Sequence, residues 1–362
     1  MKLNLRKNIY YWKSDRPYGE GNVQILNEKG FSELEKSLIQ YLNTFFKEGL
    51  LELSSGGGQG NHITFVANYA NNKYFVRVEN GPEMDDYMDV ESEVLRQVNA
   101  SGIPSPFVYH SDKSREHVPF AVQVIEFIQH DDLNALDKAE ALEILPIAET
   151  IGKYVASWQK IKPENFGLFD ASIFDTTGKL VGFHSSYEDY FFLNWHSHLS
   201  YLQENDFLTP GQVSEIKELV EANKFLLQKE EGCLVHKDLA LWNILGTESE
   251  IKAFIDWSDA IAGDEMDDIS LLACFHSGDV IEAALKGFAS VKPLPESYEK
   301  KFWLHMLRNI IFKAVIRVRG NYFNKPDGFF MNNGGVNLRD FTLERILTAC
   351  EGLKGNKKIK DI

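Results

Sequence analysis

The octapeptide His236-Lys237-Asp238-Leu239-Ala240-Leu241-Trp242-Asn243 decides how this 362-residue sequence is interpreted. The apolar residues Cys233–Val235 precede it, and a second apolar run, Ile251–Ile255, follows the polar segment Gly246–Glu250. Two short apolar runs on either side of a polar turn are typical of a β-hairpin. We therefore expect a hairpin that gathers four polar side chains at one end, those of His236, Asp238, Asn243 and Asp256.

These residue types point to phosphoryl transfer. Asn243 and Asp256 offer an amide oxygen and a carboxylate, hard ligands that suit a Mg²⁺ ion shared with phosphates. Asp238 is placed to accept a proton from an attacking hydroxyl, or to orient that hydroxyl. The spacing His-x-Asp-x-x-x-x-Asn with a later Asp is that of kinases, in which the first Asp is catalytic and the other two residues hold magnesium. We expect His236 and Asp268 to brace this loop rather than perform chemistry.

Composition argues against several classes of partner. The chain has 38 Lys+Arg and 53 Asp+Glu, a net charge of −15, which repels nucleic acids and anionic membranes. Its three widely spaced cysteines form no disulfide framework and suggest a reducing compartment. The sequence shows no secretion signal and no long apolar stretch. We expect a cytoplasmic protein with neither a nucleic acid nor a membrane as partner.

The first part of the chain predicts a strand-rich lobe. Within the first 50 residues, Leu34, Leu38 and Leu42 recur at helical spacing. A glycine-rich turn follows at Gly56–Gly60, then a hairpin around Asn71-Asn72 and a helix over 89–100. The expected strands lie at residues 63–66, 73–78, 107–109 and 120–125.

The remainder of the chain predicts a helical lobe, with the change of pattern near 128–137. A long helix is expected from about Pro146, because proline is tolerated only in the first turn. Further helices are expected near residues 210–229, 267–274, 279–288, 297–318 and 340–353. The basic tail 354–360 is expected to fray.

In this order the sequence resembles the aminoglycoside phosphotransferase/choline kinase-like family. His236–Asn243 is similar to that family's catalytic loop, Ile255-Asp256-Trp257 to its metal-binding segment and Gly263–Ser270 to its G-D-P-x-x-D-L-A motif. The run 256–260 is similar in particular to hygromycin B phosphotransferases. The resemblance implies an α+β, two-lobed protein-kinase-like fold. A small antiparallel-sheet lobe would span 1–128, with a helical extension over 1–50, and a larger helical lobe would span 129–362, with ATP or GTP and Mg²⁺ in the cleft between them.

The resemblance also covers the nucleotide-binding residues, from about residue 50 onward. Gly57-Gly58-Gln59-Gly60-Asn61 is similar to the family's G-G-x-x-N phosphate loop, although such a run by itself is as compatible with a flexible turn. The residues implied to bind nucleotide are Gly58, Gly60 and Asn61 at the phosphates, Arg77 as the strand cation, Glu91 as its helix partner, and Glu126 and Ile128 at the adenine. Glu93 remains an alternative to Glu91, and Lys73 a weaker alternative to Arg77.

Four residues depart from the family pattern. Lys237 stands where the family has glycine, and Glu265 where it has proline. Arg77 replaces the usual lysine, and its planar head must be placed differently from an ammonium. Trp158 lies where the family often has histidine. None of the four belongs to the trio Asp238, Asn243 and Asp256, so we expect activity to be retained.

The resemblance implies an ATP- and Mg²⁺-dependent phosphotransferase acting on a hydroxyl of a small molecule. The first expected acceptor is an aminoglycoside-like antibiotic, which would make the protein a resistance enzyme. Four acidic residues crowd the region after Asp256 and would attract such a polycation: Asp259, Asp264, Glu265 and Asp267. Choline-type, amino-alcohol, sugar and macrolide acceptors stay open, as does a catalytically weak nucleotide-binding regulator. A protein kinase is disfavoured because no APE-type segment follows Asp256.

Two further groups of residues are interpreted as structural. His184, His196 and His198 have no cysteine or carboxylate partners at metal-ligand spacing, so we expect scattered surface histidines. An aromatic run is expected to pack in the core, and it consists of Tyr187, Tyr190, Phe191, Phe192 and Trp195.

Overall fold

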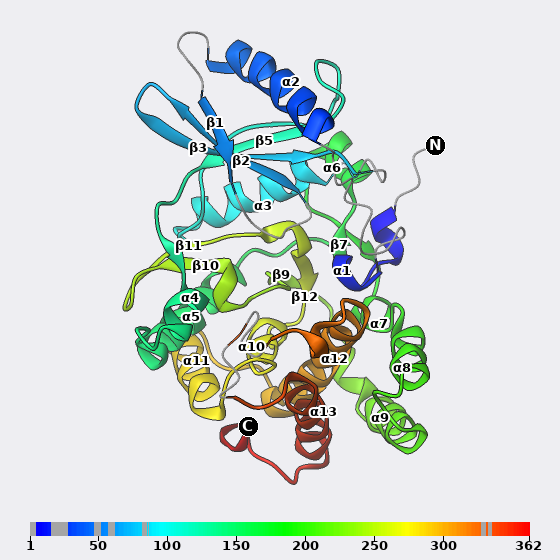
Figure 1. Ribbon diagram of the computed structural model, residues 1–362. Helices are drawn as coiled ribbons and strands as arrows, with labels where there is room; N and C mark the ends of the chain where they lie inside the picture. Colours follow the sequence, from blue (N-terminus) through cyan, green and yellow to red (C-terminus); the bar gives the residue numbers. More distant parts are fainter. Residues whose placement is uncertain are drawn as a thin grey trace. The chain divides into compact units, whose positions relative to one another are not determined.

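The computed structural model describes residues 5–15, 28–46, 52–56, 62–81, 85, 87–326, 331 and 335–362 (Figure 1). Their contacts divide the chain into two compact units. One unit is Pro17–Gln129, and the other combines Met1–Arg16 with His130–Ile362. The start of the chain therefore groups with the C-terminal unit, whereas the sequence had suggested that it extends the N-terminal lobe.

The unit Pro17–Gln129 is built on an antiparallel sheet with the strand order β1-β2-β3-β5-β4. Its strands are β1 (Glu52–Ser55), β2 (Ile63–Tyr69), β3 (Asn72–Glu79), β4 (Val108–Asp112) and β5 (Ala121–Glu126). The turn Ala70-Asn71 that joins β2 to β3 has φ of 47° and 65°, as a tight two-residue hairpin requires. The expected hairpin is confirmed.

Two helices accompany this sheet (Figure 1). Helix α2 (Glu28–Phe46) places Leu34, Leu38 and Leu42 in a core with Phe65 and Val76, which confirms the helical periodicity. Helix α3 (Met88–Ala100) packs against β4 and β5. Because side chains alternate along a strand, the neighbour of Val76 in β3 faces away from the α2 core. That neighbour is Arg77.

The C-terminal unit is mostly helical. Helix α5 (Ile144–Trp158) begins two residues before Pro146, which leaves the proline in the first turn as expected. It packs closely on α11 (Gly278–Val291), because a Cβ on Gly152 would lie 1.8 Å from the Ala284 carbonyl oxygen. The other helices are α1 (Trp12–Asp15), α4 (Leu133–Lys138), α6 (Ala171–Thr177), α7 (Tyr187–Phe191), α8 (Trp195–Glu204), α9 (Pro210–Ala222), α10 (Asp267–Leu272), α12 (Tyr298–Arg319) and α13 (Leu338–Lys354), with short 3₁₀ segments between several of them.

Two small sheets of this unit carry the candidate site. Strand β10 (Ile244–Gly246) pairs with β11 (Ile251–Phe254) and β6 (Asp131–Asp132). Strand β9 (Cys233–Val235) pairs instead with β12 (Ile261–Gly263), beside β7 (Phe166–Phe169) and β8 (Gly182–His184). The hairpin is therefore confirmed for 244–254, but Cys233–Val235 belongs to the other sheet. The segment His236–Asn243, the 236–243 loop, joins the two sheets.

Described residues near both ends of the chain are packed against the C-terminal unit. Tyr10, Tyr11 and Trp12 are buried, and the Tyr190 hydroxyl donates to the Tyr10 carbonyl at 2.7 Å. The expectation of a frayed basic tail is wrong, because Ile359 is buried and the chain there lies against Gly278 at the start of α11. Among the described residues, no helix combines the length and apolarity needed to cross a bilayer.

Candidate active site

Asp268 of α10 fixes the start of the 236–243 loop. Its carboxylate accepts hydrogen bonds from the backbone N–H groups of His236 at 2.9 Å and Lys237 at 3.0 Å. The Trp158 indole, at the end of α5, donates to the same carboxylate at 3.1 Å. The predicted bracing role of Asp268 is confirmed. Trp158 performs a structural task where the family often has histidine.

His236 ties the loop to the end of β11. Its Nδ1 atom accepts from the Asp238 backbone N–H at 3.3 Å, so its Nε2–H donates to the Ile255 carbonyl at 2.9 Å. Burial lowers the pKa of His236, against opposing effects of Asp238 and Asp256, and keeps the imidazole neutral. Both ring nitrogens are engaged by backbone, which confirms that this residue braces the loop.

Asp238 and Asn243 are in direct contact. The Asn243 Nδ2 atom donates to Asp238 Oδ2 at 3.0 Å and to the Asp238 carbonyl at 2.8 Å. The amide nitrogen is thereby committed to Asp238, which leaves the amide oxygen as the atom suited to meet a cation. A short 3₁₀ segment, Leu241–Asn243, carries the asparagine.

Asp256 follows β11 in a strained backbone conformation. The Ile255 N–H donates to the Asn243 carbonyl at 3.0 Å, so the residue before Asp256 lies beside Asn243. Asp256 has φ 61° and ψ 63°, the left-handed region that a non-glycine residue avoids at a cost of about 1–2 kcal/mol. Its Oδ1 accepts from the Ser258 hydroxyl at 3.0 Å. Such strain persists where surrounding contacts impose it, often at functional sites.

A lysine that the sequence analysis missed pairs with Asp238. The Nζ atom of Lys313, on α12, lies 2.7 Å from Asp238 Oδ1. Burial alone would raise the pKa of Asp238, but Lys313 and the neighbouring hydrogen bonds outweigh it and lower that pKa. Asp238 is thus held as a carboxylate, a state that suits orienting a hydroxyl better than abstracting its proton.

The structure explains why lysine replaces glycine at position 237. Lys237 has φ 67°, the left-handed conformation that glycine adopts without strain. Its buried ammonium lies 2.9 Å from Asp267 Oδ2, 3.0 Å from Asn309 Oδ1 and 2.7 Å from the Tyr10 hydroxyl. The side chain is committed to these buried partners within the C-terminal unit. This departure therefore leaves the 236–243 loop intact.

Most of the acidic residues expected to attract a polycationic acceptor are buried. Asp259, Asp264 and Asp267 are buried, and Asp264 lies 2.8 Å from Lys229 Nζ. Glu265 also pairs with Lys229. Buried carboxylates require paired cations, and these pairs remove the field that a polycationic acceptor would sense. The electrostatic argument for an aminoglycoside acceptor is wrong.

In the unit Pro17–Gln129, Arg77 pairs with Glu91. The Arg77 guanidinium lies 2.5 Å from Glu91 Oε1, and it also contacts Gln123 at 3.1 Å and His62 at 2.9 Å. Glu93 instead lies 3.7 Å from Arg96, near the surface. The alternative left open by the sequence is thus decided in favour of Glu91.

The remaining expected nucleotide contacts are placed in part. Glu126 ends β5, and its backbone N–H donates to the Phe107 carbonyl at 2.8 Å. Ile128 is half-buried, whereas Lys73 is exposed. Gly58, Gly60 and Asn61 lie outside the described residues.

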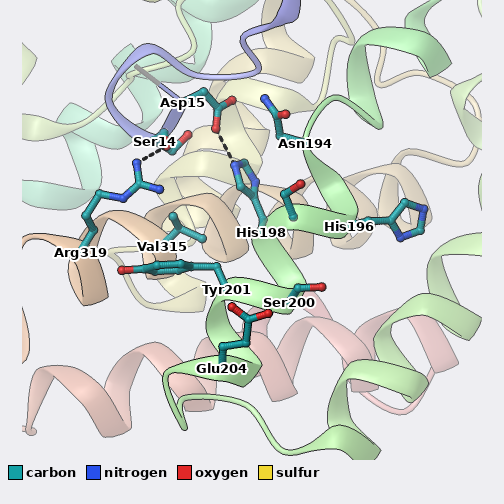
Figure 2. A pocket seen from close by; sticks show the side chains of 11 residues that line it. Ser14, Asp15, Asn194, His196, His198, Ser200, Tyr201, Glu204, Val315 and Arg319 are labelled. Carbon is teal, nitrogen blue, oxygen red and sulfur yellow. Dashed lines mark hydrogen bonds and ion pairs between the residues drawn. The ribbon is translucent and has the colours of Figure 1, made fainter. Parts of the chain in front are cut away.

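A polar cavity of about 570 Å³ opens elsewhere, between α1, α8 and α12 (Figure 2). His198 and Asp15 pair across it at 2.6 Å, while His196 points away from them. His198 is buried, so the expectation that all three histidines lie at the surface is wrong for this one. Among the described residues, no three His, Cys, Asp or Glu side chains are grouped to hold a metal. The aromatic run from Tyr187 to Trp195 is core, as predicted.

Comparison with known proteins now decides the family. Residues 54–297, more than half of the chain, match the phosphotransferase enzyme family. The chain belongs to this family. It is therefore an enzyme of the small-molecule kinase class, with a protein-kinase-like α+β fold. No curated protein matches this phosphotransferase.

Solved structures share its fold at low identity. Aminoglycoside phosphotransferase APH(4)-Ia, in ternary complex with AMP-PNP and hygromycin B, has TM-score 0.61 and 16% identity, covering 87% of this chain and 98% of that one. A putative fructosamine-3-kinase from Haemophilus somnus 129PT has TM-score 0.60 and 16% identity, covering 88% and 98%. APH(2")-IIa with streptomycin and ATP has TM-score 0.57 and 19% identity, covering 88% and 98%.

Proposed function

We propose that this phosphotransferase moves the γ-phosphoryl group of ATP to a hydroxyl of a small molecule, with Mg²⁺ as cofactor. The observation that carries the proposal is the 3.0 Å contact between Asp238 and Asn243, beside the backbone bond that joins Ile255 to Asn243. Kinases use the same combination of a catalytic carboxylate and two oxygen ligands for magnesium, held close together.

The residues present fit a magnesium ion. Asn243, whose amide nitrogen is committed to Asp238, would supply its carbonyl oxygen, and Asp256 would supply a carboxylate. Two protein ligands suit Mg²⁺, which completes its octahedron with waters and substrate phosphates. When bound, the ion would offset charge on the transferring phosphoryl group.

The chain's own side chains supply positioning. Asp238, held as a carboxylate, would align the acceptor hydroxyl with the γ-phosphate. Arg77, fixed by Glu91, would contact the phosphates. Backbone groups of Gly58, Gly60 and Asn61 would do likewise, while Glu126 and Ile128 would contact the adenine. GTP is the alternative donor.

The acceptor is proposed by class. Solved structures of the same fold include complexes with hygromycin B and with streptomycin, and a putative fructosamine-3-kinase. These support aminoglycosides and amino sugars as the first acceptors to test, followed by choline-type amino alcohols, other sugars and macrolides. The alternative of a weak regulator loses support, because Lys237 is now explained by its buried partners.

The test is ADP release from Mg²⁺–ATP against a panel of these acceptors. Asp256→Ala should abolish turnover, and Asp238→Asn should lower kcat by about 10²–10⁴-fold while nucleotide binding in a thermal-shift assay stays near normal. Asp279→Asn, an exposed carboxylate on α11, is the matched control. Near-wild-type turnover in either active-site variant would contradict the proposal. Nucleotide binding without acceptor-stimulated turnover would favour the regulator.

A further inference from the structure

Lys313 brings a cation to Asp238 from a helix distant in the sequence. Its Nζ atom lies 2.7 Å from Asp238 Oδ1, and the two side chains are only 10% and 13% exposed. The other carboxylate oxygen, Oδ2, accepts from Asn243 Nδ2 at 3.0 Å. Each oxygen of Asp238 is therefore held by a different element of the fold.

Three aromatic rings lie near the Lys313 ammonium. Its Nζ atom lies 4.7 Å from the centre of the Tyr11 ring, 5.1 Å from Phe312 and 5.8 Å from Phe275. Ring faces attract a cation and exclude water from it. Asp238 is the charged partner of the ammonium. The three rings help to hold the ammonium beside that carboxylate.

This arrangement addresses a specific weakness of an aspartate. The terminal torsion of an Asp side chain is broad and nearly two-fold, so the carboxylate rotates readily unless both oxygens are held. Phosphoryl transfer depends mainly on placing the reacting groups in line. A carboxylate that orients a hydroxyl must therefore be prevented from rotating.

We propose that Lys313 is a positioning residue for phosphoryl transfer, which holds the Asp238 carboxylate in the orientation that meets the acceptor hydroxyl. The inference rests on the proposed function, because Lys313 acts through Asp238. Tyr11, from the start of the chain, and Phe275 and Phe312 serve it by keeping the ammonium in place.

The experiment compares Lys313→Met, which keeps the length but removes the charge, with Lys313→Arg in the full-length protein. The readout is ADP release from Mg²⁺–ATP with water as acceptor, fitted for kcat and for the KM of ATP. Lys313→Met should lower kcat by about 100-fold and leave the KM of ATP unchanged. Lys313→Arg should recover much of the loss. Lys286→Met is the control, since Lys286 makes an equally short pair, 2.7 Å to Glu149, at the surface.

A double-mutant cycle identifies the route of the effect. If Lys313 acts through Asp238, adding Lys313→Met to Asp238→Asn should cause no further loss of the residual rate. Thermal unfolding midpoints of the four proteins should be non-additive in the same way. Should Lys313→Met fail to fold, Lys313→Gln takes its place under the same criteria.

The outcomes separate this inference from the proposed function. Wild-type kcat in Lys313→Met, or additive losses in the cycle, would overturn the role of Lys313 while an inactive Asp238→Asn left the proposed function standing. A fully active Asp238→Asn would overturn the proposed function itself.

Discussion

The Nζ atom of Lys237 lies 2.9 Å from Oδ2 of Asp267, and neither side chain is exposed to solvent. This buried pair ties the 236–243 loop, to which Lys237 belongs, to the start of α10. Coulomb attraction at this short distance offsets part of the free-energy cost of burying the two charges. The Tyr10 hydroxyl and the Asn309 amide oxygen supply the remaining hydrogen bonds of the Lys237 ammonium. These contacts stabilise Lys237 in its left-handed backbone conformation, which is strained for a residue other than glycine.

Removing the Lys237 charge should destabilise the fold. Lys237→Met leaves the Asp267 carboxylate buried without its cation, which should lower the free energy of unfolding by about 3–5 kcal/mol. Urea unfolding at pH 7 measures it. Lys237→Met combined with Asp267→Asn should recover part of the loss, and Lys286→Met should change little. Equal stability of Lys237→Met and wild type would refute the role of the pair.

Deleting residues 1–15 should damage the C-terminal unit. This segment buries Tyr10, Tyr11 and Trp12, each worth about 1.5–3 kcal/mol. It also makes two hydrogen bonds to the residues after Asp256. Arg6 donates to the Ser258 carbonyl at 2.8 Å, and the Trp12 N–H donates to the Asp259 carboxylate at 3.2 Å. We expect a lower thermal midpoint and slower ADP release. An unchanged midpoint would mean that the segment is dispensable.

Arg77→Lys should weaken nucleotide use. A lysine nitrogen cannot reproduce the contacts that the guanidinium makes with Glu91, Gln123 and His62 together. Loss of one charged hydrogen bond, worth about 1.5–3 kcal/mol, predicts a rise of roughly tenfold or more in the KM of ATP. Steady-state kinetics measures it. Glu93→Gln, which alters only the partly exposed pair with Arg96 and a hydrogen bond from Gln97, should behave as wild type.

Stability should fall with acidification partly through His276. Burial lowers the pKa of His276 to about 4, with a smaller effect of Arg345, against an ordinary value of 6.5. The folded state therefore binds the proton less readily than the unfolded state. The contribution of neutral His276 to the free energy of unfolding is complete above pH 6.5 and is lost as the pH falls toward 4. Between pH 7.5 and 5.0 the loss is at most about 2 kcal/mol, reduced by the residue's remaining solvent contact.

Urea unfolding at both pH values, on wild type and His276→Gln, isolates this effect. The free energy of unfolding of wild type should fall more steeply toward pH 5.0 than that of the variant. Two further histidines whose pKa is lowered by burial, His198 and His236, act in the same direction and remain in both proteins. Parallel pH profiles would show that His276 does not contribute.

The sequence predicted much of the fold because its signals are local. The spacing of Leu34, Leu38 and Leu42 anticipates α2, and the turn at Asn71 anticipates the β2–β3 hairpin. The bracing roles of His236 and Asp268 also followed from the loop pattern and are confirmed. The pairing of β9 with β12 was not predicted, because strands that are far apart in the sequence produce no local sequence pattern.

The chain by itself determined the order of its elements, the 236–243 loop and the trio Asp238, Asn243 and Asp256, since hydrophobic period and residue spacing act over a few residues. Only the tertiary structure decided which charges meet. It placed Lys313 beside Asp238, Lys237 beside Asp267 and Lys229 beside Asp264, so that carboxylates expected to attract an acceptor are paired with lysines instead. The physical reason is that the energy of a charge depends on burial and on partners that folding brings from distant parts of the sequence.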